Sequence, residues 1–380
     1  MNKVVLLGND HTNTLGLTQT LGRSGFYIIV VMWGNKTGLV KSSKYCKEVY
    51  TASTPQACID KLIQTIHGVD GIKIPIIPAC DSAALVLEDN SKALASRFVY
   101  GYSMSDYSLH QLMEKDLQVK LALDAGFNVP KSWTINNFLK LPENLNYPCL
   151  IKPLVSCQGA KQDIKICKDR KELDENIQSL KFTKQVILQQ YIDRDYEISI
   201  LGCALSNGTV IIPAIENKLT LYPKYVGLEC LARMDTLEDK EIIQCINNLI
   251  KKIKYVGIFS VEMMHCRTDN KFYFTEINLR NDGANSFVYK YGVNLPLNHI
   301  EDLTGKEITQ FKDFTPGYYI WDMHHFQSIA HREISICQWL REIRISNGFL
   351  TYFKEDKMPF YRQYTNIICR KLHLLKTENY

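Results

Sequence analysis

The chain has 380 residues, of which 46% are hydrophobic and 22% are charged. At about 150 residues per domain this length predicts two or three folding units, and the composition excludes disordered, collagen-like and coiled-coil proteins. The net charge of +5 is too small and too evenly spread to indicate nucleic-acid binding, and an anionic small molecule suits it equally well.

The N-terminal sequence MNKVVLLGNDH has too short an apolar run for a signal peptide, and no run approaches the roughly 18 apolar residues of a membrane-spanning helix. The 12 cysteines form neither a CxxC pair nor a Cys/His array at zinc spacing. They are typical of reduced, mostly buried thiols. We therefore expect a cytoplasmic protein without a membrane span.

The first hundred residues predict an open parallel α/β domain. An apolar strand at 3–8, a helix at 15–24 and a strand at 26–32 form one unit, and a strand at 74–78 begins another. The turn GNDHTNTLG after the first strand lacks the GxGxxG spacing. It is therefore either a nucleotide-binding loop or an ordinary strand-to-helix turn.

The middle of the chain predicts an α+β arrangement with mainly antiparallel sheet. Its first element is a helix over 108–127 that should end at Gly126, and strands alternate with two helices from about 148 to 279. After about residue 305 the pattern weakens into aromatic clusters and two basic helical pieces, which we interpret as an appended unit. These helices either close over the core or contact nucleic acid or another anionic surface.

The segment FTEINLR holds the most informative polar residues. Glu276 and Asn278 lie two apart on a predicted strand and so share a face, and a hairpin through RTDNK would place Glu262 beside Glu276. Adjacent carboxylates repel unless a cation neutralises them, and oxygen ligands suit Mg²⁺. Arg280 would face the same way and could hold a phosphate or carboxylate oxygen. An exposed strand of ordinary polar residues is the alternative.

Further residues predict a nucleotide site. Lys152 follows an apolar strand, and the turn SCQGA after it, which includes Ser156 and Gly159, could cover phosphates with its backbone amides. In QQYIDRDYE, backbone groups of Gln190 and Ile192 could contact an adenine edge, and the Glu197 carboxylate could accept ribose hydroxyls.

Taken in order, Lys115 in a helix, Lys152 in IKP, SCQGA, QQYIDRDYE, Glu262 and EINLR resemble the ATP-grasp superfamily over roughly residues 1–305. Within it, the chain is most similar to the carboxylate-amine ligases related to D-aspartate ligase and to the halves of carbamoyl phosphate synthetase. The resemblance implies a pre-ATP-grasp α/β domain (1–106), a two-subdomain ATP-grasp fold (107–305; lid about 107–190, metal and phosphate subdomain about 191–305) and a C-terminal extension (306–380).

The resemblance also implies an enzyme that forms an amide or peptide bond through an acyl phosphate, on an amino acid, peptide or cell-envelope precursor. It assigns Lys115, Lys152, Ser156, Gly159, Gln190, Ile192 and Glu197 to ATP, and Glu262, Glu276 and Asn278 to Mg²⁺, with Mn²⁺ as an alternative. Arg280 would steady the transferred phosphoryl group. Lys218 would contact the γ-phosphate, a solvated strand lysine being the alternative.

The sequence departs from the family pattern at three places. Ser156, Cys157 and Gln158 stand where Gly is common, Leu279 where Pro is frequent, and Gln190 where Glu is frequent. The three metal positions are intact, which favours an active enzyme. A carboxyphosphate-forming carboxylase or carbamoyl-phosphate-synthetase-like enzyme, and a non-catalytic ATP-binding regulatory module, are the alternatives. The expected partners are ATP and small-molecule carboxylates and amines, without nucleic acid; a homodimer stays open.

The remaining histidines have structural explanations. His265 lies three residues from Glu262, a spacing that places the two on opposite faces of a strand. The group of His324, His325 and His331 lacks cysteine partners or a metal-ligand spacing, so we interpret these residues as surface or packing histidines.

Overall fold

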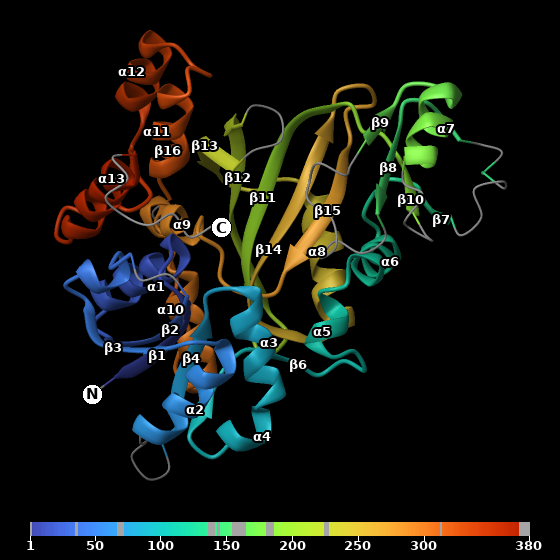
Figure 1. The fold of residues 1–380 in the computed structure, drawn as a ribbon. Coiled ribbons are helices and arrows are strands. Elements are labelled where there is room, and N and C mark those ends of the chain that lie inside the picture. The colour runs from blue at the N-terminus through green and yellow to red at the C-terminus, as the bar shows by residue number, and fades with distance from the viewer. Residues whose placement is uncertain are drawn as a thin grey trace.

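In the part of the chain that it describes, the computed structural model shows three β-sheets (Figure 1). It describes residues 2–34, 37–66, 72–135, 141–142, 145–153, 165–179, 186–223, 228–311 and 314–371. Within those ranges, no helix has both the length and the hydropathy to cross a bilayer.

The first sheet confirms the predicted parallel α/β domain, with strands in the order β3-β2-β1-β4-β5. The central strand is buried along almost its whole length, as expected where helices cover both faces. Because the strand order reverses beside it, the loop after it opens at the edge where such sheets bind ligands. The elements are β1 (Lys3–Asn9), α1 (Thr12–Arg23), β2 (Tyr27–Trp33), η1 (Val40–Ser42), β3 (Cys46–Ala52), α2 (Pro55–Thr65), β4 (Ile74–Pro78), α3 (Asp81–Asp89), α4 (Ser91–Leu94) and β5 (Phe98–Val99).

The single helix predicted over 108–127 is two helices, α5 (Leu109–Leu112) and α6 (Lys115–Ala125). Ser108 and Gln111 form a capping box that starts the first turn, and the chain then leaves the helix at Met113. The side-chain amide of Gln118 donates to the backbone carbonyl of Leu112 over 2.9 Å, so this carbonyl has a hydrogen bond although the helix ends there. The end at Gly126, with φ of +103°, is as predicted.

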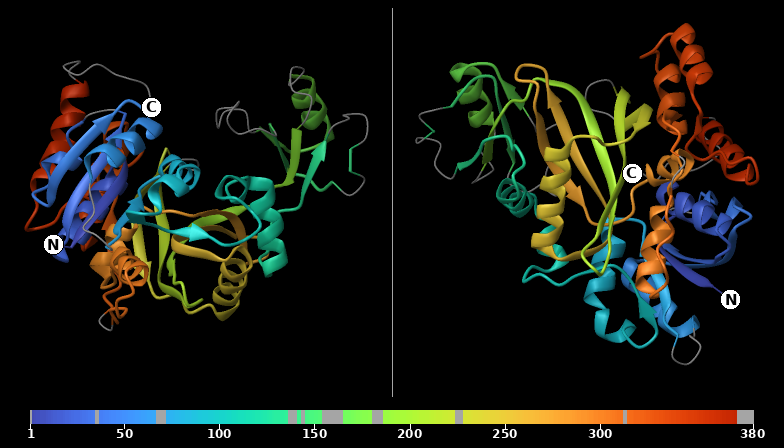
Figure 2. Two further views of the ribbon diagram at one scale, coloured as in Figure 1. Left: turned by 90° about the horizontal axis from the view of Figure 1, so that it is seen from below. Right: turned by 180° about the vertical axis from the view of Figure 1, so that it is seen from behind.

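The second sheet is a small antiparallel unit in the order β7-β10-β8-β9, with one helix beside it. Figure 2 shows this unit, which we call the lid sheet, at the opposite end of the molecule from the N-terminal sheet. Its elements are β7 (Ser132–Ile135), β8 (Cys149–Pro153), β9 (Lys165–Cys167), α7 (Arg170–Ser179) and β10 (Val186–Gln190).

The third sheet, which we call the large sheet, has the order β15-β14-β11-β12-β13-β16-β17, with β6 paired to β14. The amphipathic helix α8 covers one face, where five of its apolar residues pack on buried strand side chains. The elements are β6 (Tyr102–Ser103), β11 (Arg194–Ala204), β12 (Val210–Tyr222), β13 (Leu228–Asp235), α8 (Lys240–Ile253), β14 (Tyr255–Cys266) and β15 (Phe272–Asn278).

The segment after residue 305 is part of the large sheet, which the sequence pattern did not predict. β16 pairs antiparallel with β13, with Tyr319 opposite Ala232, and β17 pairs parallel with β16. α9 and α10 pack against α1, and α10 also contacts β4 of the first sheet. The elements are α9 (Asn285–Tyr291), α10 (Leu295–Leu303), β16 (Gly317–Ile320), α11 (Asp322–Ala330), α12 (Ile336–Ile345), β17 (Gly348–Phe349) and α13 (Met358–Lys371).

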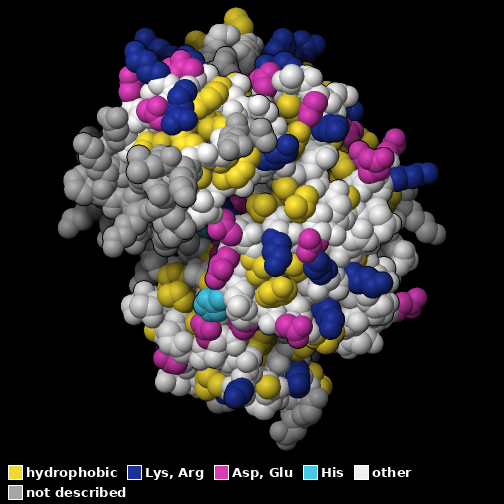
Figure 3. All heavy atoms as spheres, turned by 90° about the vertical axis from the view of Figure 1, so that its right-hand side faces the viewer, with side chains coloured by type: hydrophobic (Ala, Val, Ile, Leu, Met, Phe, Trp, Pro, Cys, Tyr) yellow, Lys and Arg dark blue, Asp and Glu magenta, His cyan; other side chains and the backbone are white. Residues whose placement is uncertain are grey.

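The surface charge is mixed on the face that Figure 3 shows. Lys and Arg side chains there are interspersed with Asp and Glu and do not gather into one stripe.

His299 in α10 makes the stability of the fold pH-dependent. The side chain is buried, and loss of hydration lowers its imidazole pKa to about 4. Between pH 6.5 and 4 the unfolded chain therefore binds more protons than the folded one, so the free energy of unfolding falls as the pH falls. We expect His299→Gln to reduce the loss between pH 7 and 5 by about 2 kcal/mol in urea titrations.

The matched control for this prediction is the exposed His110, which pairs with Asp89 over 2.9 Å. His110→Gln should keep the native pH dependence. If His299→Gln and the native protein lose the same free energy between pH 7 and 5, His299 is not the group responsible.

Candidate functional site

One face of the large sheet is polar and the other is apolar. In β11, Ile198 and Ile200 are buried on the α8 side, and Glu197 and Ser199 alternate with them because successive strand residues point to opposite faces. The paired strands β12, β14 and β15 place their polar residues on the same face as Glu197 and Ser199. The polar face carries Glu197, Ser199, Glu216, Lys218, Ser260, Glu262, Glu276 and Asn278.

The hairpin of β14 and β15 pairs as predicted, with Glu262 opposite Glu276 and Ser260 opposite Asn278. Loss of hydration raises the pKa of Glu262 to about 7, although Lys218 works against this shift, and repulsion from Glu276 adds to it. The fold thus holds two carboxylates side by side, and this arrangement disfavours the ionised form of Glu262.

These donors fit a hard divalent cation. Two carboxylates and the amide of Asn278 offer the oxygen ligands that Mg²⁺ prefers. Across the described ranges, no three His, Cys, Asp or Glu side chains are grouped as a metal site. In proteins Mg²⁺ is usually held by one or two carboxylates and fills its other positions with waters and substrate phosphates.

Two cations flank the carboxylate pair. Lys115, the first residue of α6, has its Nζ 3.6 Å from Glu276 Oε2 and is 61% exposed. Lys218 is buried, with Nζ 2.6 Å from Glu229, 3.2 Å from Glu262 and 4.0 Å from Glu197. Burial alone would lower the Lys218 pKa, but the surrounding carboxylates raise it well above its usual value. Lys218 is therefore a buried charge centre of the site and not a solvated strand lysine.

Arg280 joins the polar face to the N-terminal domain. Its guanidinium donates to Asp81 in α3 over 3.0 Å, to Asp282 over 3.1 Å and to the side-chain amide oxygen Oδ1 of Asn278 over 3.1 Å. Burial would raise the Asp282 pKa, but Arg280 and a backbone hydrogen bond from Ala284 lower it, which keeps this carboxylate charged.

The predicted adenine and ribose residues lie where the lid sheet meets the large sheet. The Gln190 backbone amide donates to the Lys131 carbonyl over 2.8 Å, and the Ile192 side chain packs with Cys266 and Tyr273. Glu197 pairs with Arg194 beside Lys218. Of the predicted phosphate residues, Lys152 lies on β8 opposite Ile187, but its side chain, Ser156 and Gly159 are outside the described residues.

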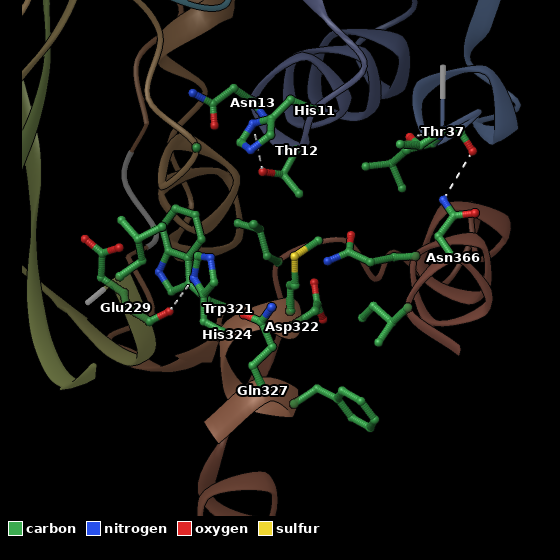
Figure 4. Close-up of a pocket in the computed structure, with 18 of the residues that line it drawn as sticks. His11, Thr12, Asn13, Thr37, Glu229, Trp321, Asp322, His324, Gln327 and Asn366 are labelled. Atoms are coloured by element: carbon green, nitrogen blue, oxygen red, sulfur yellow. Dashed lines mark hydrogen bonds between the residues drawn. The ribbon is translucent and has the colours of Figure 1, made fainter. Parts of the chain in front are cut away.

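A cavity of about 520 Å³ lies beside the polar face (Figure 4). Glu262 lines it from β14, Arg280 and Asp282 from the segment after β15, and Asp10 to Asn13 from the loop after β1 and the start of α1. α11 and α13 close the other sides. Of the predicted metal and phosphoryl residues, Glu262 and Arg280 therefore open into a space that could hold a small molecule.

Sequence reasoning missed the cavity residues His11, Trp321 and His324. Trp321 Nε1 donates to Glu216 over 3.0 Å, and its ring stacks on His324 with ring centres 6.4 Å apart. The sequence pattern predicts a surface or packing role for His324, whereas the structure places this residue in the lining of the cavity. One signal was available, because GNDH follows the central strand of a parallel sheet at the edge where ligands bind.

A family model described as the ATP-grasp domain matches residues 120–286. An N5-carboxyaminoimidazole ribonucleotide synthase from Staphylococcus saprophyticus is 24% identical over 228 residues, 58% of each chain. The alignment thus spans little more than half the length of that relative.

Two solved structures share the fold. An N5-carboxyaminoimidazole synthetase from Staphylococcus aureus has a TM-score of 0.64 at 14% identity, over 83% of this chain and 81% of the other. An L-amino acid ligase from Bacillus licheniformis has a TM-score of 0.58 at 15% identity, over 83% of this chain and 79% of the other.

Proposed function

Because the chain belongs to the ATP-grasp superfamily, we propose that it is an ATP- and Mg²⁺-dependent ligase that joins a carboxylate to an amine. Its product is an amide or peptide bond, formed through an acyl phosphate on an amino acid, a peptide or a cell-envelope precursor. The observation that carries this proposal is the pairing of Glu262, which lines the cavity, with Glu276, a pair that Lys115 and Lys218 flank.

The residues of the site fit the charge changes of this reaction. Glu262, Glu276 and Asn278 would hold Mg²⁺, which when bound neutralises phosphate charge. Lys115 and Lys152 would position the phosphates, and the backbone of Gln190 and Ile192 with the Glu197 carboxylate would position the nucleoside.

Arg280 would steady the transferred phosphoryl group as the substrate carboxylate attacks the γ-phosphate. Its hydrogen bonds to Asp81 and Asp282 fix the guanidinium at the cavity before substrate arrives. Phosphoryl transfer needs such positioning and charge neutralisation more than a covalent nucleophile.

A carboxylase is the second candidate, because the names of two similar proteins describe a carboxylated amine. Those names also describe a ribonucleotide or its base. Among the described residues that line the cavity, however, Arg280 is the single Lys or Arg, and it is already paired with two carboxylates. The cavity therefore favours an acceptor without a phosphate group.

Release of ADP and phosphate from Mg·ATP tests the proposal. The protein is offered D- and L-amino acids singly, in pairs, and with peptides or bicarbonate. Release that depends on one acid and one amine supports the ligase, whereas release that depends on bicarbonate supports the carboxylase. ATP binding without release across the panel would contradict both and favour a regulatory module.

A further inference from the structure

Two histidines that the proposed function does not use face the cavity from different elements. His11 precedes α1 in the N-terminal domain, and His324 lies in the first turn of α11. Figure 4 shows them on different sides of the same space, with Trp321 beside His324. Both belong to the cavity that Glu262 and Arg280 line.

The hydrogen-bond partner of His324 assigns its tautomer. Its Nδ1 lies 3.0 Å from the Glu229 carbonyl oxygen. A carbonyl can only accept, so Nδ1 must carry the hydrogen. In the neutral ring the other nitrogen, Nε2, then has a free lone pair.

His11 has the opposite tautomer. Its Nδ1 accepts from the Asn13 backbone amide at the start of α1 and lies 3.3 Å from the Thr12 hydroxyl. Nδ1 therefore has no hydrogen in the neutral ring, and Nε2 carries it. The cavity thus has one imidazole whose free nitrogen accepts and one whose free nitrogen donates.

Both rings favour the neutral form at neutral pH. Loss of hydration lowers the His324 pKa, although Glu229 works against this shift. Loss of hydration also lowers the His11 pKa, as do His324 and Arg280, whereas Asp10 raises it. These are the charged groups that face the two rings from β13, the loop after β1 and the end of β15.

The charges of the cavity suit an ammonium group better than a second anion. Among its described lining residues five are carboxylic acids and one is an arginine. Apolar side chains from α11, α13 and neighbouring loops line the rest of the space. These are Leu39, Met323, Phe326, Ala330, Leu350 and Ile367.

We propose that this cavity binds the amine acceptor of the ligase, a primary amine with a partly apolar body and no phosphate, and that His324 is its general base. This inference rests on the proposed function. Nε2 of His324 takes one proton from the acceptor's ammonium group. The freed nitrogen lone pair bonds to the acyl carbon, the bond from that carbon to the phosphate oxygen breaks, and the phosphate leaves with the electron pair. The adduct nitrogen loses its second proton to the phosphate or to water.

His11 has the complementary role of holding the acyl group. Its Nε2–H donates to an oxygen of the acyl phosphate while His324 receives the proton. A donor and an acceptor on different sides of one space would orient the two reactants before the bond forms.

The tautomers are tested on the protein without substrate. ¹⁵N NMR of histidine-labelled protein at pH 7 should show His324 neutral with hydrogen on Nδ1, and His11 neutral with hydrogen on Nε2. The spectra of His324→Asn and His11→Asn assign the signals. A His324 ring that is cationic at pH 7, or that carries its hydrogen on Nε2, would overturn the assignment of the base.

The catalytic role is tested with two nucleophiles. Hydroxylamine is largely unprotonated at pH 7 and needs no base, whereas an amino acid amine does. His324→Asn keeps a donor for the Glu229 carbonyl, so it should form hydroxamate from ATP and the acid within about twofold of the native rate. Its amide formation should fall by about 10²-fold or more, as for loss of a general base, and should regain activity as the pH rises.

His110→Asn is the matched control, because that imidazole is exposed and bonds to Asp89 in α3. Native protein that forms neither product with any acid overturns the proposed function. Native protein that forms both, with His324→Asn unchanged or impaired equally in both reactions, overturns the role of His324. The proposed class of acceptor is tested by comparing the rates of amide formation with leucine and with O-phosphoserine. A faster reaction with O-phosphoserine would contradict an acceptor without a phosphate group.

Discussion

Glu276→Ala is expected to lower Mg·ATP-dependent turnover by about 10²–10³-fold or more, the usual loss when a group that stabilises developing charge is removed. Glu276 lies opposite Glu262 and 3.6 Å from Lys115, so its loss removes half of the carboxylate pair and the partner of a proposed phosphate ligand. Its side chain is only partly buried, at 29% exposed, so the fold should persist. Steady-state ADP release and a urea unfolding curve measure the two quantities.

Glu307→Ala is a matched control for this substitution, because Glu307 is an exposed glutamate outside the cavity. It should leave both turnover and stability near native. Unchanged turnover in Glu276→Ala, with the native Mg²⁺ dependence, would remove Glu276 from the metal site.

Lys218→Met is expected to destabilise the protein by about 3 kcal/mol or more, because it leaves buried carboxylates without their cation. Glu229, Glu262 and Glu216 all act on this lysine, and Glu216 is itself buried. The loss should be smaller at pH 6 than at pH 8. Burial already raises the pKa of Glu262 to about 7, so a proton can replace the missing charge at the lower pH.

Lys252→Met is the corresponding control at the surface. Lys252 pairs with Asp124 over 2.5 Å, but both side chains are about 40% exposed. Such a pair contributes about 1 kcal/mol or less. Urea titrations that give equal losses for the two lysine variants would contradict the account of Lys218 as a buried charge centre.

The sequence predicted those parts of the site that depend on short-range geometry. Glu276 and Asn278 share a face because strand residues alternate, and Glu262 reaches Glu276 because a short turn joins their strands. The end of α6 at Gly126 followed from backbone freedom at glycine. The assignments of these residues to ATP, Mg²⁺ and the phosphoryl group remain predictions that the variants above can test.

The cavity could not be predicted in the same way. His11 and His324 are more than 300 positions apart, and no local pattern specifies that α11 faces the loop after β1. The pairing of β16 with β13 was missed for the same reason. The local sequence GYYIWD indicates only an aromatic cluster, and this segment forms a strand because it pairs with β13. The break at Met113 was missed because the hydrogen bond that stabilises it comes from the side chain of Gln118, in the following helix, and not from the residues at the break.

The place of β16 and β17 in the large sheet has a consequence for biosynthesis. A ribosome makes β13 about 80 residues before the strand that covers its edge, and α11 and α13 follow later still. Until then the nascent chain carries an unpaired strand edge, which is a template for pairing with other chains. The cavity should therefore form only after α13 has been synthesised, and the yield of the protein in cells should depend on chaperones that shield this edge during translation.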